Sequence, residues 1–234
     1  MQTVEFDLQQ LPYEINEELK QLRTNLQFCG TDKRVLLMTS AVSGEGKSTV
    51  VLDLARSLTQ LGKSVMIIDA DMRKSVMKTK LIGKAPEHGL SHFLSGQCGV
   101  DDVIIKTNVR NLFVVFSGSV PPNPAELLAS KNMEDLIKIG RMNCDYVIVD
   151  CPPIGMVVDA AIVAPLCDGS MIMIEAGKIK YRHAQEVVEK MRTTGTPILG
   201  VILNKVDYHN TSRYYGKYYG KYYGKYGKYG KYYQ

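Results

Sequence analysis

The chain has 234 residues, 45% of them hydrophobic, which is enough for one large domain with a substantial core. Residues 208–234 hold six Lys and Arg and no acid, so without them the formal net charge of +5 becomes −1. This distribution excludes a nucleic-acid-binding surface spread over the whole protein, and we expect no specific nucleic-acid partner.

Five cysteines without a CxxC pair suit a reduced protein better than a disulfide scaffold. The N-terminal stretch MQTVEFDLQQLPYEIN does not join a basic start to an apolar segment, so we predict no signal peptide. No apolar run approaches the roughly 20 residues that span a bilayer. We therefore expect a cytoplasmic protein that contacts a membrane through a partner or a charged surface.

Short β-branched segments alternate with longer amphipathic segments along residues 1–207. The first expected element is a helix at about residues 15–27. The expected strands are 34–39, 64–69, 111–116, 146–150, 170–175 and 198–204. The expected later helices are 46–60, 125–141, 159–166 and 181–194. Strands that are apolar almost throughout are buried on both faces, so we predict a three-layer α/β domain with a mostly parallel central sheet.

The first expected strand runs into a phosphate-binding loop, TSAVSGEGKST. Residues 41–48 fit G-x-x-x-x-G-K-[ST], with Ala41 in place of the usual first glycine. Gly44 and Gly46 let the backbone wrap around phosphates, Lys47 supplies positive charge, and the Ser48 hydroxyl can ligate Mg²⁺. The motif lies between a strand and a helix, as its mechanism requires. The predicted nucleotide-binding residues here are Ser43, Gly44, Glu45, Gly46, Lys47, Ser48 and Thr49.

Three aspartates lie where expected strands end. Asp69 and Asp71 belong to VMIIDADMR, and Asp150 belongs to YVIVDCPP. The carboxyl ends of parallel strands open onto the ligand crevice, where acids can hold Mg²⁺ beside nucleotide phosphates. A helix cap would explain one such residue, but three beside a phosphate loop favour a metal site. We predict binding of ATP or GTP with Mg²⁺, the metal being held by Ser48, Asp69, Asp71 and Asp150.

The segments SGEGKS, IIDADMRKS, SGSVPPNPAELL and YVIVDCPP, followed by a tyrosine cluster, resemble the bacterial tyrosine kinases of capsular and exopolysaccharide systems. The resemblance covers essentially the whole chain. It implies a P-loop NTPase fold that transfers the γ-phosphate of ATP to tyrosines of the C-terminal cluster. It also implies that Lys47, Asp69, Asp71 and Asp150 are catalytic, with Asp69 or Asp71 taking the proton of the attacking phenol. Such a base is needed because a phenol of pKa about 10 is a poor nucleophile at neutral pH.

Residues 208–234 form a YYGK/YGK repeat that has nothing to bury, and we predict a disordered tail. The resemblance makes its tyrosines the phosphate acceptors. They are Tyr214, Tyr215, Tyr218, Tyr219, Tyr222, Tyr223, Tyr226, Tyr229, Tyr232 and Tyr233. The length of the tail permits transfer within one subunit or between subunits. We predict transfer between subunits.

The same family carries an E-x-x-R-x-x-R pattern on its first helix, which assembles a ring of subunits. Glu17 and Arg23 match it, but Lys20 replaces the first arginine and cannot make the same planar, bidentate contact. A charged helix face with i,i+3 pairs is the alternative interpretation.

The resemblance also implies a role in regulating polysaccharide polymerisation and export. It implies three partners: further copies of the chain, a membrane-embedded co-polymerase that activates the kinase, and a phosphotyrosine phosphatase. The co-polymerase would recruit the protein to the inner face of the cell membrane.

Two further residues are candidates for nucleotide contacts. Arg73, in DADMR, would clamp phosphate charge, and an arginine paired with a neighbouring acid is the alternative. Asn204, in ILNKVD at the end of the last strand, resembles the base-contacting asparagine of related NTPases, and a turn residue is the alternative.

Two other functions fit parts of the sequence. Partitioning and cell-division-site ATPases share the fold, but they carry K-G-G-x-G-K-[ST], and here Val42 and Ser43 stand at the first lysine and first glycine. A nucleotide-gated binding module would use the Tyr/Lys tail to bind single-stranded nucleic acid or anionic lipid. The tail lacks the motif of any known nucleic-acid-binding fold, which disfavours that function.

Overall fold

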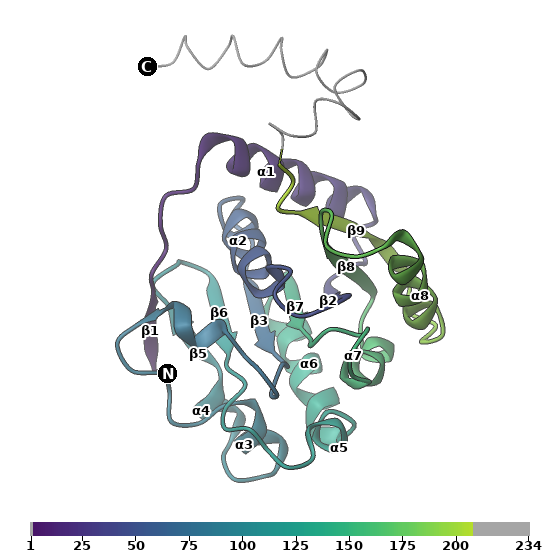
Figure 1. The fold of residues 1–234 in the computed structure, drawn as a ribbon. Helices are drawn as coiled ribbons and strands as arrows, with labels where there is room; N and C mark the ends of the chain where they lie inside the picture. Colours follow the sequence, from purple (N-terminus) through teal and green to yellow (C-terminus); the bar gives the residue numbers. More distant parts are fainter. Residues whose placement is uncertain (1, 208–234) are drawn as a thin grey trace, which may run out of the picture.

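The computed structural model describes residues 2–207, and a nine-stranded sheet forms its centre (Figure 1). The strand order is β4-β1-β5-β6-β3-β7-β2-β8-β9. The pairs β1–β4 and β5–β6 are antiparallel, whereas the central pairs from β6 to β9 are parallel. The predicted α/β fold with a mostly parallel sheet is confirmed. The prediction of a disordered tail lies outside the described residues.

The strands are β1 (Thr3–Phe6), β2 (Val35–Ser40), β3 (Val65–Asp69), β4 (Leu81–Ile82), β5 (Ile105–Thr107), β6 (Leu112–Val115), β7 (Tyr146–Asp150), β8 (Gly169–Glu175) and β9 (Ile198–Asn204). The α-helices are α1 (Tyr13–Phe28), α2 (Lys47–Thr59), α3 (Leu90–Leu94), α4 (Val100–Val103), α5 (Pro124–Leu128), α6 (Lys131–Asn143), α7 (Asp159–Val163) and α8 (Tyr181–Arg192). Two 3₁₀ turns, Met77–Lys80 and Ala164–Leu166, complete the described elements.

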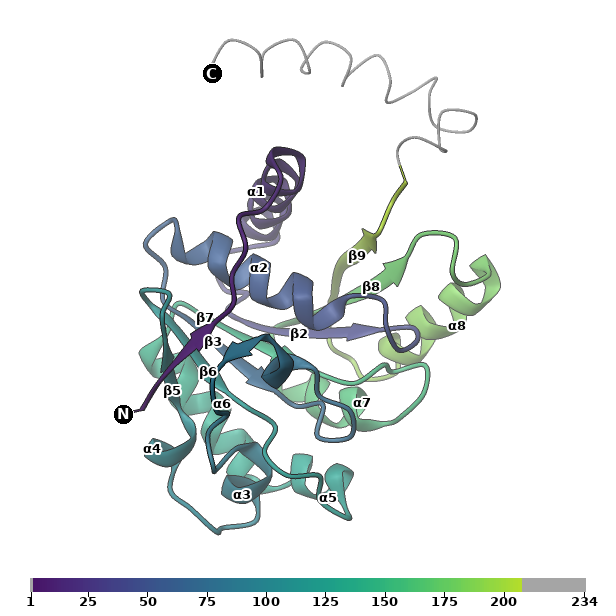
Figure 2. The same ribbon diagram turned by 60° about the vertical axis from the view of Figure 1, so that its left-hand side comes forward.

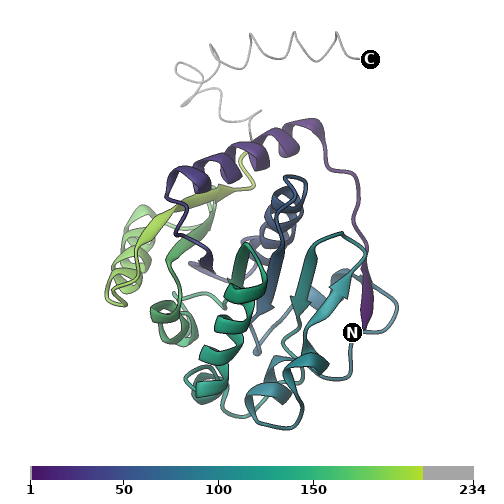
Figure 3. The ribbon, with the colours of Figure 1, turned by 180° about the vertical axis from the view of Figure 1, so that it is seen from behind.

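Helices cover both faces of the sheet, as Figures 2 and 3 show from two sides. Helix α2, with α1 outside it, packs on one face, and α6, α7 and α8 pack on the other. Neighbouring residues of the central strands point to opposite faces, so Leu36 joins the core under α2 and Leu37 joins the core under α6. Both leucines are fully buried. The apolar strands of the sequence are therefore explained by burial on both faces.

Two predictions about elements are corrected by the structure. The single helix predicted at 125–141 is two helices, α5 and α6, because Ser130 is extended (φ −75°, ψ 158°) and occupies the cap position of α6. The sequence analysis also missed β1, β4 and β5, which lie at one side of the sheet and are two to four residues long. Segments that short contain too few residues for a periodic signal.

The Asp168 carboxylate connects β2, β8 and α6 at the end of the strands opposite the phosphate loop. Asp168, just before β8, accepts hydrogen bonds from the backbone N–H groups of Arg34 (2.9 Å) and Val35 (2.7 Å). The guanidinium of Arg141 donates to both of its oxygens, at 3.0 and 2.8 Å. Partial burial would raise the pKa of Asp168, but these hydrogen bonds outweigh burial and leave the pKa below its usual value.

Asp168→Asn is expected to lower the free energy of unfolding by about 1.5–3 kcal/mol, because it removes hydrogen bonds to a charged group. Urea unfolding at pH 7 measures this. The carboxylate's contribution is present above about pH 4 and is lost as the pH falls through the lowered folded-state pKa. The difference between the two proteins should therefore vanish in acid.

The control for this comparison is Glu189→Gln, which breaks an exposed ion pair with Arg192 on α8. Exposed pairs contribute little, so this variant should unfold within about 0.5 kcal/mol of the parent. Equal losses in both variants would contradict the special role of Asp168.

Candidate functional site

The phosphate loop joins β2 to the first turn of α2. Gly44 and Gly46 have positive φ angles of 80° and 87°, which only glycine adopts without strain. Gly46 is also the cap residue of α2, so the N–H groups and the positive dipole end of that helix face the loop. A Cβ on Gly46 would lie 2.3 Å from the side-chain nitrogen of Asn204. The loop therefore has the shape of an anion-binding site, and the Asn204 side chain packs closely against Gly46.

Two of the predicted nucleotide-binding side chains brace this loop. The buried Glu45 carboxylate accepts hydrogen bonds from the N–H groups of Ala41 (2.8 Å), Val42 (2.9 Å) and Glu175 (3.0 Å). The Asn204 amide donates to the Glu45 carbonyl oxygen at 2.7 Å. These bonds tie the ends of β8 and β9 to the loop. A direct contact of either side chain with nucleotide stays a prediction.

The structure brings Lys47, Asp69 and Asp150 together. Asp69 and Asp150 are register partners at the ends of the neighbouring parallel strands β3 and β7, and both are buried. The Lys47 ammonium donates a hydrogen bond to Asp150 Oδ1, and its side chain is only 8% exposed. Burial and the nearby Asp150 carboxylate raise the pKa of Asp69 to about 7. Burial lowers the pKa of Lys47. The carboxylates of Asp150, Asp71 and Asp69 outweigh burial, and the net shift of the pKa is upward.

The other predicted metal ligands lie at the same edge of the sheet. Ser48 is buried in the first turn of α2, and Asp71 Oδ1 accepts the Lys74 N–H at 2.9 Å. Asp150 Oδ2 is buried and has no hydrogen-bond partner among residues 2–207. A buried, unpaired carboxylate oxygen suits a cation or a water bound to one.

No group of three or more His, Cys, Asp or Glu side chains in the described part of the chain is arranged to hold a metal by itself. The residues therefore do not form a closed protein cage. Mg²⁺ is ordinarily held by one or two carboxylates together with waters and substrate phosphates. The open set of Ser48, Asp69, Asp71 and Asp150 fits that mode, and each of these metal contacts stays a prediction.

Arg73 forms an ion pair with an aspartate in the structure. Its guanidinium donates to both oxygens of the fully buried Asp159, at 2.8 and 2.9 Å. This contact matches the alternative of an arginine paired with an acid. A phosphate contact by Arg73 stays a prediction.

The predicted oligomerisation residues lie on α1. The Lys20 ammonium pairs with Glu17 on the exposed face, at 2.6 Å. Arg23 points the other way and donates to the carbonyl oxygen (2.8 Å) and hydroxyl (3.1 Å) of Ser57 in α2. Arg23 thus fastens α1 to the phosphate-loop helix within one chain. A role in assembly stays a prediction.

The sequence analysis missed two lysines beside the phosphate loop. Lys178 donates to the Ser43 carbonyl at 3.1 Å and Lys205 to the Gly44 carbonyl at 2.9 Å. Both also bind Glu175, at 2.9 and 3.0 Å. Each follows the carboxyl end of a strand, β8 or β9, and that position was the available signal.

Comparison with known proteins identifies the family. Residues 33–195 match the AAA domain family. The chain is 43% identical to the tyrosine-protein kinase CpsD of Streptococcus agalactiae over 92% of its own length and 90% of the relative's. The chain belongs to the bacterial tyrosine kinases of capsule systems. It is thus a protein-tyrosine kinase, as the motifs predicted.

Solved structures agree with this family. The kinase domain of the Escherichia coli tyrosine kinase ETK is 33% identical, with a TM-score of 0.77, over 82% of this chain and 75% of that one. The chimerical protein CapA2B2 is 28% identical, with a TM-score of 0.80, over 88% and 94%. The septum site-determining protein MinD of Pyrococcus horikoshii is 22% identical, with a TM-score of 0.61, over 73% and 69%. That likeness shows the fold alone, and the kinase relatives set aside a partitioning-type ATPase.

Gly46→Ala is expected to abolish tight nucleotide binding by this kinase. The added Cβ would collide with Asn204 and force a left-handed backbone on an alanine. Titration with a fluorescent ATP analogue measures the affinity, and at least a tenfold loss is expected.

Gly62→Ala is the matched control, because Gly62 has a similar φ of 77° but nothing within 4 Å of an added Cβ. Both variants should lose about 1–2 kcal/mol of stability from the backbone strain. If Gly62→Ala lost nucleotide affinity as strongly, strain alone would explain the result and the role of the loop would be wrong.

Proposed function

We propose that this kinase uses ATP with Mg²⁺ to phosphorylate tail tyrosines of a neighbouring copy of itself. The main support is the constellation of Lys47, Asp69 and Asp150 at the phosphate loop. The second support is the tail, which carries the ten predicted acceptor tyrosines and begins a few residues beyond β9. The Lys205 ammonium already contacts the loop, so the chain leaves the described domain beside the proposed nucleotide site.

The residues divide the chemistry among themselves. The loop N–H groups and Lys47 would bind the β- and γ-phosphates, and Ser48, Asp69, Asp71 and Asp150 would hold Mg²⁺. The metal would neutralise charge on the phosphates. The tyrosine oxygen forms a bond to the γ-phosphorus while the bond from that phosphorus to the bridging oxygen breaks, and ADP leaves. The phenol proton passes to Asp69 or Asp71.

We further infer that the phosphorylation regulates polymerisation and export of a capsular or exopolysaccharide. Membership of the capsule kinases supports this role. A ring of copies, a membrane-embedded co-polymerase and a phosphotyrosine phosphatase are the proposed partners. No helix among residues 2–207 has the length and apolar character to cross a bilayer. We propose that the kinase is cytoplasmic and that the co-polymerase brings it to the inner face of the membrane.

Transfer between subunits is tested by mixing the intact chain with a Lys47→Met chain of different size. Labelled ATP, Mg²⁺ and the cytoplasmic segment of the co-polymerase are added, and the label on each chain is mapped. We expect label on tail tyrosines of the Lys47→Met chain, because that chain cannot phosphorylate itself. Label on the intact chain alone would show transfer within one subunit, and hydrolysis without phosphotyrosine would refute the proposed acceptor.

Ser48→Ala is expected to raise the Mg²⁺ concentration for half-maximal phosphorylation about tenfold or more, since a metal ligand is lost. The measurement is a Mg²⁺ titration at saturating ATP, compared with the parent. An unchanged Mg²⁺ dependence with a lower maximal rate would instead give Ser48 a structural role.

A further inference from the structure

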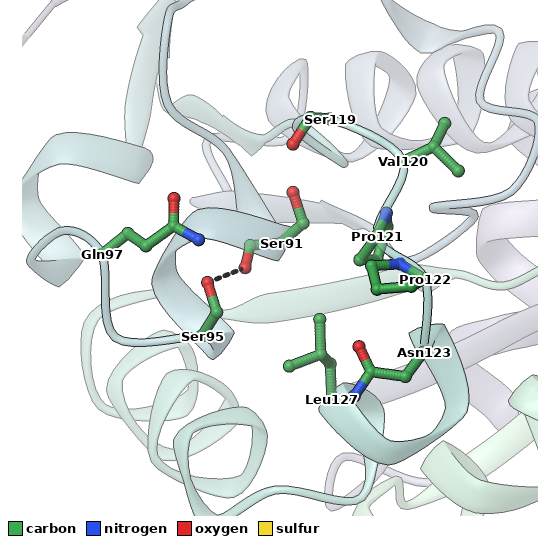
Figure 4. Close-up of a pocket in the computed structure, with 9 residues that line it drawn as sticks. All are labelled: Ser91, Ser95, Gln97, Ser119, Val120, Pro121, Pro122, Asn123 and Leu127. Atoms are coloured by element: carbon green, nitrogen blue, oxygen red, sulfur yellow. Dashed lines mark hydrogen bonds between the residues drawn. The ribbon is translucent and has the colours of Figure 1, made fainter.

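A cavity opens between α3 and the loop that follows β6 (Figure 4). Its volume is about 210 Å³. We call it the Ser91 pocket. Its hydroxyl side is formed by Ser91, Ser95 and Ser119, and its apolar side by Pro121, Pro122 and Leu127.

The Ser91 pocket is joined to the catalytic site through one residue. The Ser117 N–H donates to Asp69 Oδ2 at 3.4 Å, and the Ser117 carbonyl accepts the Ser91 N–H at 3.0 Å. Asp69 and Ser91 therefore bind the two peptide groups of the same residue. A peptide entering the catalytic site would place neighbouring residues within reach of this pocket, since an extended chain advances about 3.3 Å per residue.

The pocket contains a polar group without a partner. Ser91 is 4% exposed, and its hydroxyl oxygen has no hydrogen-bond partner among the described residues. The Ser91 carbonyl accepts the Ser95 hydroxyl at 2.8 Å, and Figure 4 shows the Ser91 hydroxyl pointing away from that bond, toward Ser119. Buried hydroxyls are normally hydrogen-bonded, so this one is suited to a ligand.

The lining fits a phenol. On one wall the Ser95 hydroxyl donates to the Ser91 and His92 carbonyls and the Ser119 hydroxyl contacts His92 Nε2 at 3.3 Å, so the Ser91 hydroxyl is the unpartnered one of the three. The prolines and leucine of the other wall offer apolar surface for an aromatic ring. The volume equals that of roughly seven water molecules, which is enough room for a phenol ring. The residues that line the pocket carry no charge, and the Glu126 carboxylate binds Asn123 at the rim, at 2.6 Å. A phosphorylated ring would meet no compensating charge from this lining.

We propose that the Ser91 pocket holds an unphosphorylated tail tyrosine while a neighbouring tyrosine of the same tail is phosphorylated. The proposal rests on the proposed function. In the YYGK/YGK repeat, successive tyrosines are separated by one or three positions, so a second phenol always lies near the acceptor. Phosphorylation of the docked tyrosine ends its docking, because the phosphate is excluded. The pocket thus makes a fresh tail a better substrate than a modified one.

The test is a double-mutant cycle with size-tagged Lys47→Met chains as acceptors. The enzyme is the intact chain or Ser91→Ala. The acceptor keeps its full tail or keeps Tyr222 alone, with the other ten tyrosines of residues 208–234 replaced by Phe. Phosphate on the acceptor is measured, and KM and kcat are determined. Loss of acceptor sites affects both enzymes equally and cancels in the cycle.

With the full tail, Ser91→Ala is expected to raise KM about 3- to 10-fold, the effect of one lost hydrogen bond, with little change in kcat. With the acceptor that keeps Tyr222 alone, the same substitution should change KM by less than twofold. Ser130→Ala is the matched control. Its hydroxyl is also buried and unpartnered within residues 2–207, but Ser130 does not line the pocket, and KM should not change.

Equal effects of Ser91→Ala on both acceptors would overturn the pocket proposal and leave the proposed function standing. Failure of the intact enzyme to phosphorylate any Lys47→Met chain would overturn the proposed transfer between subunits, and the pocket proposal with it. Binding of a fluorescent ATP analogue by Ser91→Ala should match the parent, which would show that the nucleotide site is unaffected.

Discussion

The buried contact between the Lys47 ammonium and the Asp150 carboxylate is the interaction on which the site depends. It joins the first turn of α2 to the end of β7, and both side chains are inside the protein. Neither charge would be tolerated there alone, since breaking a buried pair costs about 3–5 kcal/mol. Asp69, the register partner of Asp150, adds a second carboxylate that burial makes costly to ionise. Charges kept at such cost are typical of a site that handles charged ligands.

The surrounding contacts hold this pair and the phosphate loop in place. Glu45 fixes the loop from within, and Asn204 holds it from the end of β9. On the other flank, the Ser117 peptide contacts Asp69 and leads into the loop with the two prolines. Nucleotide chemistry and a proposed tyrosine-docking pocket therefore share one edge of the sheet. Both are built from loops at the carboxyl ends of parallel strands.

The fold alone would not identify the activity, because MinD shares it at 22% identity. The features that distinguish this chain lie outside the common sheet and helices. One is Val42, which stands where partitioning-type ATPases carry the early loop lysine. Others are the loop of residues 117–123, which precedes α5, and the tyrosine tail. The kinases CpsD and ETK are 43% and 33% identical to this chain, whereas MinD shares the fold at 22% identity.

The sequence by itself determined the sheet type, the phosphate loop and the aspartates at strand ends. These follow from local signals: strands apolar on both faces, a contiguous motif, and acids at the carboxyl ends of β3 and β7. The tertiary structure alone decided which distant groups meet. It paired Arg73 with Asp159, turned Glu45 into the loop, and brought Lys205 onto Gly44. Such contacts depend on strand order and register, which a single sequence does not encode locally. The same reason explains the missed edge strands and the break at Ser130, where packing overrides the local pattern.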